Sequence, residues 1–304
     1  MVHKEQPGIA QGNASVEHVR RGERTIEQAQ EEASELETLE LQLLLDAIYL
    51  RYGYDFREYA YASLRRRVAN VLKSEGVATI SGLQERLLHD PTCIQRFLFA
   101  LSVNVTAFFR DPGFFLTFRT KVAPLLRTYP FLRIWHAGCS TGEEVYSMAI
   151  LLEEEGLYDR CRLYATDMDE MVLKHAREGI FALDVTEKHA ANYIQAGGKR
   201  KLSDYYTSGY GNAMFHSSLR DNMVFSRHNL AMDHSFNEFN VILCRNVMIY
   251  FTKPLQQRVH TLLFDSLSMF GVLGIGSKES LQFMPHEANF EQIETGCKLY
   301  RRVQ

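Results

Sequence analysis

The sequence predicts an α/β protein, in which an all-helical domain precedes a mostly parallel sheet that carries a small antiparallel insertion. Two observations lead to this fold class. Up to residue 101 the apolar residues recur at helical spacing, whereas after Pro130 short apolar segments alternate with amphipathic ones. Strands and helices that alternate with crossovers of this length are typical of a parallel sheet.

Length and composition are those of a globular protein. The chain has 304 residues, is 46% hydrophobic and carries a net charge of −3, which is enough for one large domain and a smaller one. It has neither an apolar run of membrane-spanning length nor an apolar signal region, so we expect a cytoplasmic protein without membrane insertion. The charge offers no general attraction to nucleic acid, and we expect none as a partner.

The cysteines argue against a metal site or a disulfide framework. They are odd in number, widely spaced, and form no CxxC pair or metal-ligand pattern: Cys93, Cys139, Cys161, Cys244 and Cys297. We therefore expect reduced thiols and no metal.

The N-terminal part divides into a tail and a helical domain. Residues 1–35 are rich in Glu, Gln, Arg and Gly, which predicts a flexible polar tail. Leu36, Leu39, Leu43 and Leu50 then follow helical spacing and predict the buried face of a helix that Gly53 ends. Helical patterns continue through residues 59–76, 83–88 and 94–101, so the predicted helical domain spans residues 36–101.

Residues 102–130 form the predicted linker, with a helix, between the two domains. The stretch "SVNVTAFFRDPGFF" sets two adjacent phenylalanines beside an arginine and an aspartate. We expect Phe108 and Phe109 to pack as core, and the stretch is either a buried hinge between two helices or the lid of a binding site. Residues 131–304 carry the strand and helix alternation, interrupted at about 193–218 by a polar segment whose Gly-rich turns predict the antiparallel insertion.

The segment "IWHAGCSTGEE" predicts a strand, a small-residue turn and a helix. Gly138 and Gly142 in such a turn let the backbone approach a ligand at the carboxyl end of the strand, although the same pattern is common in plain packing. Asp167 ends the second strand, where it could accept hydrogen bonds from ribose hydroxyls. Asp169 is the expected N-cap of the following helix.

The pair Glu143–Glu144 bears on the choice of cofactor. Carboxylates at the head of the first helix serve a pyrophosphate poorly but suit an ammonium and a sulfonium, which favours S-adenosylmethionine over NAD. A simpler interpretation is that they complement the helix dipole. At the end of "VILCRNVMIYF", Arg245 and Asn246 need buried partners, and Tyr250 lies close enough to offer its hydroxyl.

Taken together, "SVNVTAFFRD", "GCSTGEEVYS", "ATDMD", "HNL", "CRNVMIYF" and "GSKES" resemble the CheR-type family. These are S-adenosylmethionine-dependent methyltransferases that esterify glutamates on bacterial chemoreceptors. The resemblance runs from about Leu36 to the C-terminus. It implies a Rossmann-like class I methyltransferase domain with a small β-subdomain, an N-terminal helical domain for substrate recognition, S-adenosylmethionine as cofactor and S-adenosylhomocysteine as product.

The resemblance also implies site residues. The implied cofactor site comprises Asn104, Thr106, Arg110, Gly138, Glu143, Asp167, Asn229, Leu230, Arg245 and Asn246. Arg110 and Tyr250 are implied to lie near the transferred methyl as the catalytic pair. A glutamate carboxylate is already an ionised nucleophile, so positioning matters more than a general base.

The implied partner is a chemoreceptor, or a receptor-like protein, with Glu/Gln-rich methylation helices. The basic cluster Arg65, Arg66 and Arg67 would face it, although an Arg-rich helix face is otherwise simply solvated. The tail could bind other signalling proteins. Asn240 stands where the family often has Asp, and the segment from Tyr193 to Asn229 looks longer than in members that dock a receptor's C-terminal pentapeptide, which argues against such tethering.

Three other functions stay open at this point. A methyltransferase for a nitrogen or hydroxyl acceptor would share the cofactor site. A non-catalytic module that senses S-adenosylmethionine or its product would share it too, but would not need both Arg110 and Tyr250. A NAD-dependent enzyme would require a different cofactor.

Overall fold

The computed structural model describes residues 12–101 and 106–304, with side chains from residue 31 onward. The chain forms two compact units. The first comprises residues up to 57 together with 72–89, and the second comprises residues 58–71 and 90–304. The larger unit includes residues 58–71 and 90–101, which precede the expected linker, and the expected domain boundary at residue 101 stays a prediction.

The first unit is helical. It contains α1 (Gly12–Tyr52), the end of α2 (Tyr61–Glu75) and α3 (Ile80–His89). Its buried apolar residues are Leu41, Leu44, Leu45, Ile48, Phe56, Ile80, Leu83 and Leu87. Hydrogen bonds tie α1 to α3: the Tyr52 hydroxyl donates to the Leu87 carbonyl at 2.5 Å, and Ser81 donates to Glu40 Oε1 through its N–H at 3.2 Å and through its hydroxyl at 2.5 Å.

Two expectations for this unit were wrong. Residues 12–35 belong to α1 and do not form a flexible tail, because Glu, Gln, Ala, Leu and Arg dominate the segment and all favour helix. The expected buried stripe is exposed: Leu36 by 57%, Leu39 by 54%, Leu43 by 49% and Leu50 by 82%. The segment carries two apolar stripes, and spacing alone cannot tell which of them faces the core.

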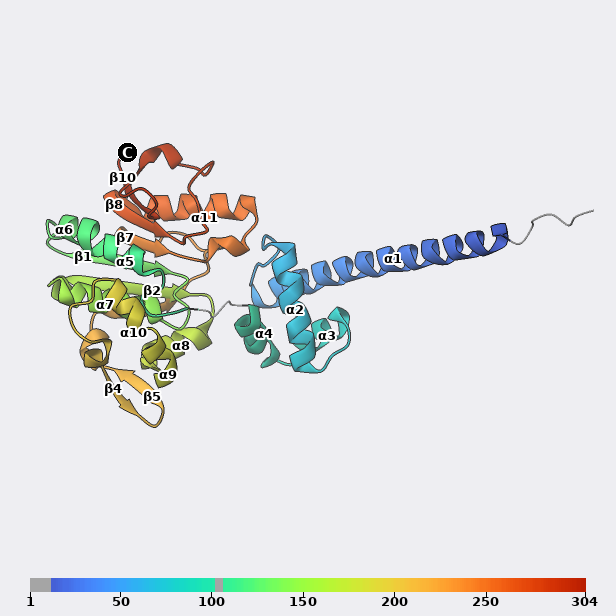
Figure 1. Cartoon of the computed structure of the whole chain (residues 1–304), viewed down its shortest axis with the longest axis horizontal. Coiled ribbons are helices and arrows are strands. Elements are labelled where there is room, and N and C mark those ends of the chain that lie inside the picture. The colour runs from blue at the N-terminus through green and yellow to red at the C-terminus, as the bar shows by residue number, and fades with distance from the viewer. Residues whose placement is uncertain (1–11, 102–105) are drawn as a thin grey trace, which may run out of the picture. The chain divides into compact units, whose positions relative to one another are not determined.

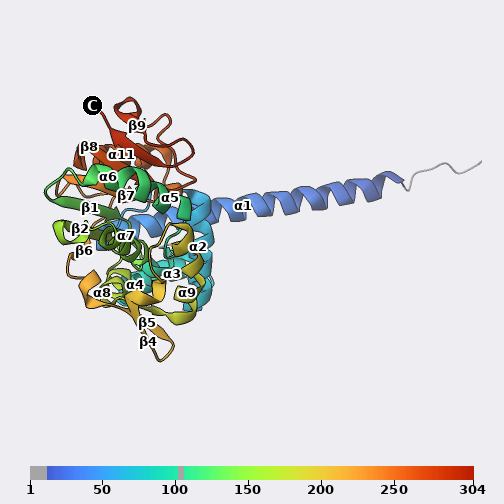
Figure 2. The same ribbon diagram turned by 60° about the vertical axis from the view of Figure 1, so that its left-hand side comes forward.

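The second unit is built on a seven-stranded sheet (Figures 1 and 2), with strand order β6-β2-β1-β7-β8-β10-β9. The strands are β1 (Leu132–Ala137), β2 (Cys161–Asp167), β6 (Met223–Arg227), β7 (Phe239–Cys244), β8 (Leu267–Ile275), β9 (Phe290–Gln292) and β10 (Leu299–Arg302). The first five in spatial order are parallel, and β10 and β9 add antiparallel to β8. The carboxyl ends of β1, β2 and β7 therefore lie at one edge, as the sequence predicted.

Helices and apolar side chains cover both faces of this sheet. The helices are α5 (Pro112–Thr117), a π-helical turn (Phe118–Val122), α6 (Ala123–Leu126), α7 (Glu143–Glu154), α8 (Glu170–Glu178) and α11 (Lys253–Ser266). A further helix of this unit, α4 (Cys93–Leu101), contacts α8. Successive residues of a strand point to opposite faces. Accordingly Ile134 packs in a cluster with residues of α5 to α7, whereas Trp135 packs in a second cluster with residues of α11.

The antiparallel insertion is a separate three-stranded sheet of order β3-β5-β4. It comprises β3 (Ile180–Ala182), α9 (Leu183–Lys188), α10 (Ala190–Gln195), β4 (Tyr206–Gly209) and β5 (Asn212–Phe215). The expected bounds of 193–218 omitted β3, because a three-residue strand directly after Gly179 shows no period of two. Tyr193 lies in α10.

Short 3-10 turns occur at Tyr158–Arg160, Leu202–Tyr205, Ser217–Leu219, Met248–Tyr250 and Glu287–Asn289.

Phe108 and Phe109, in the linker, are fully buried. The Phe108 ring stacks on Phe215 at 4.9 Å, and the Phe109 ring lies 5.1 Å from that of Tyr193. The phenylalanines therefore anchor the linker to the insertion, as core residues. Within the described residues, no helix is long and apolar enough to cross a membrane.

Candidate functional site

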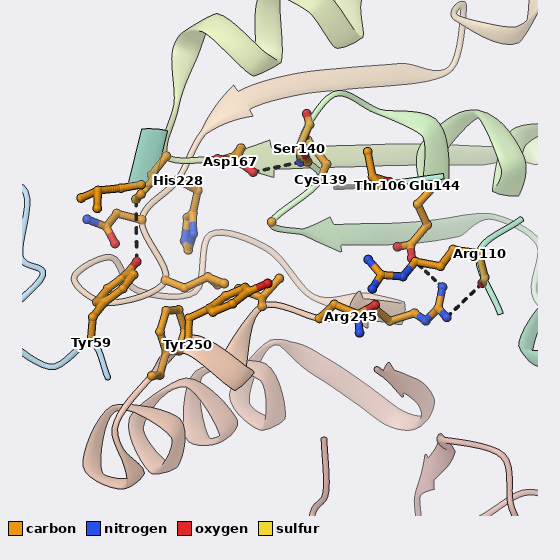
Figure 3. A pocket seen from close by; sticks show the side chains of 18 of the residues that line it. Tyr59, Thr106, Arg110, Cys139, Ser140, Glu144, Asp167, His228, Arg245 and Tyr250 are labelled. Carbon is orange, nitrogen blue, oxygen red and sulfur yellow. Dashed lines mark hydrogen bonds and ion pairs between the residues drawn. The ribbon is translucent and has the colours of Figure 1, made fainter. Parts of the chain in front are cut away.

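A pocket opens at the carboxyl ends of β1, β2 and β7 in the larger unit. The empty space within it is about 980 Å³, open solvent at its mouth included. Figure 3 shows many of its side chains. The lining residues are Tyr59, Arg67, Leu101, Thr106, Arg110, Gly138, Cys139, Ser140, Glu144, Asp167, Met168, His228, Asn229, Leu230, Arg245, Asn246, Val247, Tyr250 and Phe251.

The turn after β1 brings backbone to the pocket wall. Gly138 and Cys139 N–H both donate to the Thr166 carbonyl, at 2.8 and 2.9 Å, which fixes the turn to the end of β2. Gly138 has φ of +76°, and a Cβ there would lie 2.6 Å from Val247 Cγ2. Glycine is therefore required both for the backbone conformation and for the close approach.

Asp167 ends β2 and lines the pocket. Its Oδ2 accepts from Ser140 N–H at 2.9 Å and its Oδ1 from Asp169 N–H at 3.1 Å. Burial raises the pKa of Asp167 to about 6, although these backbone donors favour the charged form. Asp169 caps α8 by accepting from Met171 N–H at 2.8 Å, as predicted.

Glu144, and not Glu143, faces the pocket. One Glu144 oxygen accepts from Arg245 Nη1 at 2.8 Å, and the other lies 3.1 Å from His136 Nδ1. Burial opposes ionisation, but Arg245 and His136 hold the pKa of Glu144 at about 2. The Glu143 carboxylate instead accepts from the Thr141 hydroxyl at 2.6 Å, and its pKa is raised by burial. Glu143, expected in the cofactor site, is not among the residues that line the cavity, because neighbouring side chains of a helix point about 100° apart. Its role toward the cofactor stays a prediction.

Arg245 links the linker to β7. Its guanidinium is 1% exposed and donates to Asp111 Oδ2 at 2.8 Å and to the Arg110 carbonyl at 3.1 Å. Its charge is therefore balanced by Glu144 and Asp111. The sequence predicted that Arg245 has buried partners but did not identify them.

Arg110 reaches the pocket from a strained turn. The residues on either side, Phe109 and Asp111, have φ of +51° and +57°, a left-handed conformation that is costly for such side chains. Ser147 holds the turn by accepting from Phe109 N–H at 2.9 Å. Backbone strain that is held by surrounding contacts in this way is common at functional sites, where it fixes the direction of a side chain.

A buried carboxylate holds the turn after β7. Glu279 accepts from the N–H groups of Asn246, Val247 and Met248 at 3.1, 2.9 and 2.8 Å, and from that of Gly276 as well. Asn246 has φ of +60°. Glu279, from "GSKES", therefore positions Asn246 without lining the pocket.

Tyr250 forms an aromatic platform for Arg67. The Arg67 guanidinium carbon lies 4.4 Å from the centroid of the Tyr250 ring, a favourable cation–π distance. Arg67 also donates through Nη1 to the Leu101 carbonyl. Its Nη2 is buried, with no hydrogen-bond partner among the residues that the structure describes. Burial lowers the pKa of Arg67.

The neighbouring arginines behave differently. Arg65 and Arg66 are exposed and do not line the pocket, whereas Arg67 is only 6% exposed. The segment that carries Arg67 joins the pocket rim through backbone bonds from Ala60 N–H to the Tyr250 carbonyl and from Thr252 N–H to the Glu58 carbonyl, both 2.9 Å.

The loop after β6 forms another wall of the pocket. His228 N–H donates to the Asp167 carbonyl at 3.0 Å, and the Asn229 side chain accepts from Ala231 N–H at 3.0 Å. Asn229 and Leu230 both line the cavity.

Most of the residues expected in the site do line the same cavity. Thr106, Arg110, Gly138, Asp167, Asn229, Leu230, Arg245, Asn246, Tyr250 and Arg67 line one cavity. Asn104 lies outside the described residues. Sequence reasoning named Glu144 beside Glu143 without choosing it for the site, and it missed Tyr59 and His228 as lining residues. Tyr59 carries no local signal: it pairs with Phe251 by a β-bridge, and its hydroxyl lies 3.8 Å from Met168 Sδ.

Two family models match the chain. Residues 104–297 match the model of the CheR methyltransferase SAM-binding domain, and residues 39–102 match that of the CheR methyltransferase all-alpha domain. The chain belongs to the CheR methyltransferase family. It is an S-adenosylmethionine-dependent methyltransferase of the chemotaxis type.

Individual relatives agree with this assignment. A putative methyltransferase Cher3 of Pseudomonas putida is 48% identical over 264 residues, which cover 87% of this chain and 97% of that protein. The chemotaxis protein methyltransferase 2 of Pseudomonas aeruginosa is 32% identical, covering 81% and 88% of the two chains. The chemotaxis protein methyltransferase of Listeria innocua is 30% identical, covering 75% and 85%.

The CheR pocket fits S-adenosylmethionine by its donor set. Two carboxylates, Glu144 and Asp167, suit an ammonium and a ribose diol, and Gly138 leaves room for close approach by lacking a Cβ. No group of His, Cys, Asp and Glu able to hold a metal ion occurs among the residues described. Asn240, the departure from the family pattern, accepts from Arg133 N–H at 2.8 Å and does not line the pocket.

Proposed function

We propose that this CheR protein methylates glutamate side chains of a chemoreceptor with the pocket residues in defined roles. The observation that carries the proposal is the distribution of charge in one cavity. In Figure 3, Glu144 and Asp167 lie on a different side of the pocket from Tyr250. Arg67 stacks on the ring of Tyr250. Carboxylates suit a cationic cofactor, and an arginine on an aromatic platform suits an anionic acceptor.

S-adenosylmethionine supplies a methyl group on a sulfonium, which a glutamate oxygen takes to give a methyl ester and S-adenosylhomocysteine. In this proposal Asp167 accepts from the ribose hydroxyls, Glu144 faces the ammonium, and Asn229 and Leu230 border the adenine. Thr106, Gly138 and Asn246 complete the walls. The helical domain recognises the receptor. Docking of a receptor's C-terminal pentapeptide on the antiparallel insertion is not required.

On the acceptor side, Arg110 and Tyr250 flank the reacting carboxylate. The carboxylate needs no base, so the task of these residues is to hold it in line and to exclude water. Arg67 supports them by stacking on the Tyr250 ring, which fixes the orientation of that ring, and its guanidinium adds positive charge to this wall of the pocket. Arg65 and Arg66, being exposed, contact the surrounding receptor surface.

A matched pair of variants on one helix tests these roles. Arg67→Lys keeps the charge but loses the planar donor geometry. It should lower methyl transfer to receptor-containing membranes by about tenfold to a hundredfold, while calorimetry finds unchanged affinity for S-adenosylhomocysteine. Arg66→Lys, on an exposed neighbour, should change neither quantity.

Arg110→Ala should likewise lose methyl transfer with cofactor binding retained to within about tenfold. The assignment fails if Arg67→Lys methylates receptors as well as the unmodified chain does. It fails equally if Arg67→Lys binds S-adenosylhomocysteine as poorly as it transfers, because the residue would then serve the cofactor and not the acceptor.

A further inference from the structure

Helix α1 has a second apolar face that its own unit leaves uncovered. Leu36, Leu39 and Leu43 are each about half exposed and Leu50 is 82% exposed. Their spacing of three, four and seven residues places them in one stripe along a helix. Scattered exposed leucines are ordinary, but a contiguous stripe of them marks an interaction surface.

This leucine stripe, Leu36, Leu39, Leu43 and Leu50, is distinct from the face that packs in the unit. With about 100° of rotation per residue, it lies roughly opposite Leu41, Leu44, Leu45 and Ile48, which are buried. Figure 1 shows α1 as one continuous helix. The helix therefore presents an ordered apolar surface and needs no folding step to form it.

The charge around the stripe restricts what can cover it. Residues 31–50 contain six acidic residues, Glu31, Glu32, Glu35, Glu37, Glu40 and Asp46, and no Lys, Arg or His. At about 100° of rotation per residue, Glu35 and Glu40 flank the leucine stripe, and Glu32 and Asp46 lie in line with it. In a coiled coil the residues that flank the apolar seam face those of the partner. A second copy would therefore bring carboxylates against carboxylates, and an anionic membrane would be repelled in the same way.

We infer that the leucine stripe docks a basic amphipathic helix of a partner protein, with apolar residues at heptad spacing and Lys or Arg beside them. Such a helix buries the leucines and neutralises the acidic flanks at once. The family's all-alpha model begins at residue 39, so α1 extends N-terminal of it and Leu36 lies outside. Leu39, Leu43 and Leu50 lie within the matched residues, so the stripe begins before the family's all-alpha domain and continues into it. The inference does not depend on the roles proposed for the pocket.

The test uses the full chain and two labelled synthetic peptides of three heptads, with leucine at both seam positions. One peptide carries Lys at every flanking position and the other carries Glu. Fluorescence anisotropy should show micromolar binding of the Lys peptide, weakened by added salt, and no binding of the Glu peptide.

Variants then locate the binding. Leu36→Glu combined with Leu43→Glu should weaken the Lys peptide by about tenfold or more, even though the added charge attracts it. Leu125→Glu, at a leucine 38% exposed on α6, should leave binding unchanged. All variants should retain methyl transfer and their thermal midpoint, which shows that they fold.

Three outcomes overturn the inference. Equal binding of both peptides would show unspecific apolar contact, and no binding of the Lys peptide at millimolar concentration would show that the stripe does not dock such a helix. A chain that sediments as a dimer, and becomes a monomer in the double leucine variant, would show that a second copy covers the stripe.

Discussion

Two neighbouring glutamates in the first turn of α7, Glu143 and Glu144, should differ strongly in how much stability their charge contributes. Glu144→Gln keeps the size of the side chain but leaves Arg245, 1% exposed, with Asp111 as its remaining anionic partner. Glu143→Gln removes a charge that burial already disfavours, since the pKa of Glu143 is raised. The pair forms a matched test, because both substitutions are the same and lie one residue apart.

The magnitude for Glu144 follows from its ionisation. A pKa held at about 2 instead of 4.5 corresponds to about 3 kcal/mol of stability near neutral pH. Because the folded pKa is depressed, this contribution is fully present above pH 4.5 and is lost as the pH falls through 2. We therefore expect Glu144→Gln to lower the thermal midpoint at pH 7 by roughly 6–12 °C, with a smaller difference from the unmodified chain below about pH 4.

Differential scanning calorimetry at several pH values measures this, together with titration of S-adenosylhomocysteine. Glu143→Gln should change the free energy of unfolding by less than about 1 kcal/mol at pH 7. The variant loses the favourable interaction of a carboxylate with the N-terminus of α7, but it also removes the cost of burying that charge. Its cofactor affinity should be unchanged, whereas that of Glu144→Gln should fall. If Glu143→Gln were the destabilised, non-binding variant, the orientation of the first turn described here would be refuted.

Three further outcomes are expected. The affinity for S-adenosylhomocysteine should fall by about tenfold per pH unit below pH 6, because burial raises the pKa of Asp167 to about 6 and the ribose needs its charged form; in Asp167→Asn this pH dependence should disappear, and a steep profile there would contradict the assignment. Gly138→Ala should cost roughly 1–3 kcal/mol and weaken cofactor binding, because its Cβ would lie 2.6 Å from Val247 Cγ2; adding Val247→Ala should recover part of the loss, and no recovery would mean that the backbone angle alone is responsible. Arg119→Ala should lower the free energy of unfolding by about 3 kcal/mol, because Glu154, 1% exposed, loses a 2.7 Å ion pair; hydrogen exchange should then speed up in β4 and β5, and unchanged exchange there would show that the ion pair does not support the insertion.

The sheet was predictable because its strands carry a strong local signal. Segments such as Leu132–Ala137 and Phe239–Cys244 are apolar throughout and are bounded by turns, so their order and parallel pairing follow from the alternation with helices. The short strand Ile180–Ala182 was missed because three residues show no period. On α1 the pattern was ambiguous, since leucines mark both faces and only packing against α3 selects the buried one.

The site was predictable where motifs lie at strand ends. Asp167 and Arg245 follow apolar strands directly, and parallel strands bring such residues to one edge. The choice between Glu143 and Glu144 depends on the rotation of a helix that begins after Gly142, with φ of +99°, and no residue pattern records that rotation. Arg67 joins the pocket only because α2 turns it toward Tyr250, while Arg65 and Arg66 on the same helix face outward.

The central claim is that the pocket methylates receptor glutamates. The most direct measurement incubates the chain with methyl-labelled S-adenosylmethionine and membranes that contain chemoreceptors, and follows the label by gel, mild alkali and peptide mass spectrometry. The account predicts label on receptor glutamates that is released as methanol in base, and that is lost with Arg110→Ala. Label that is stable to base, or that lies on lysine or serine, would contradict it.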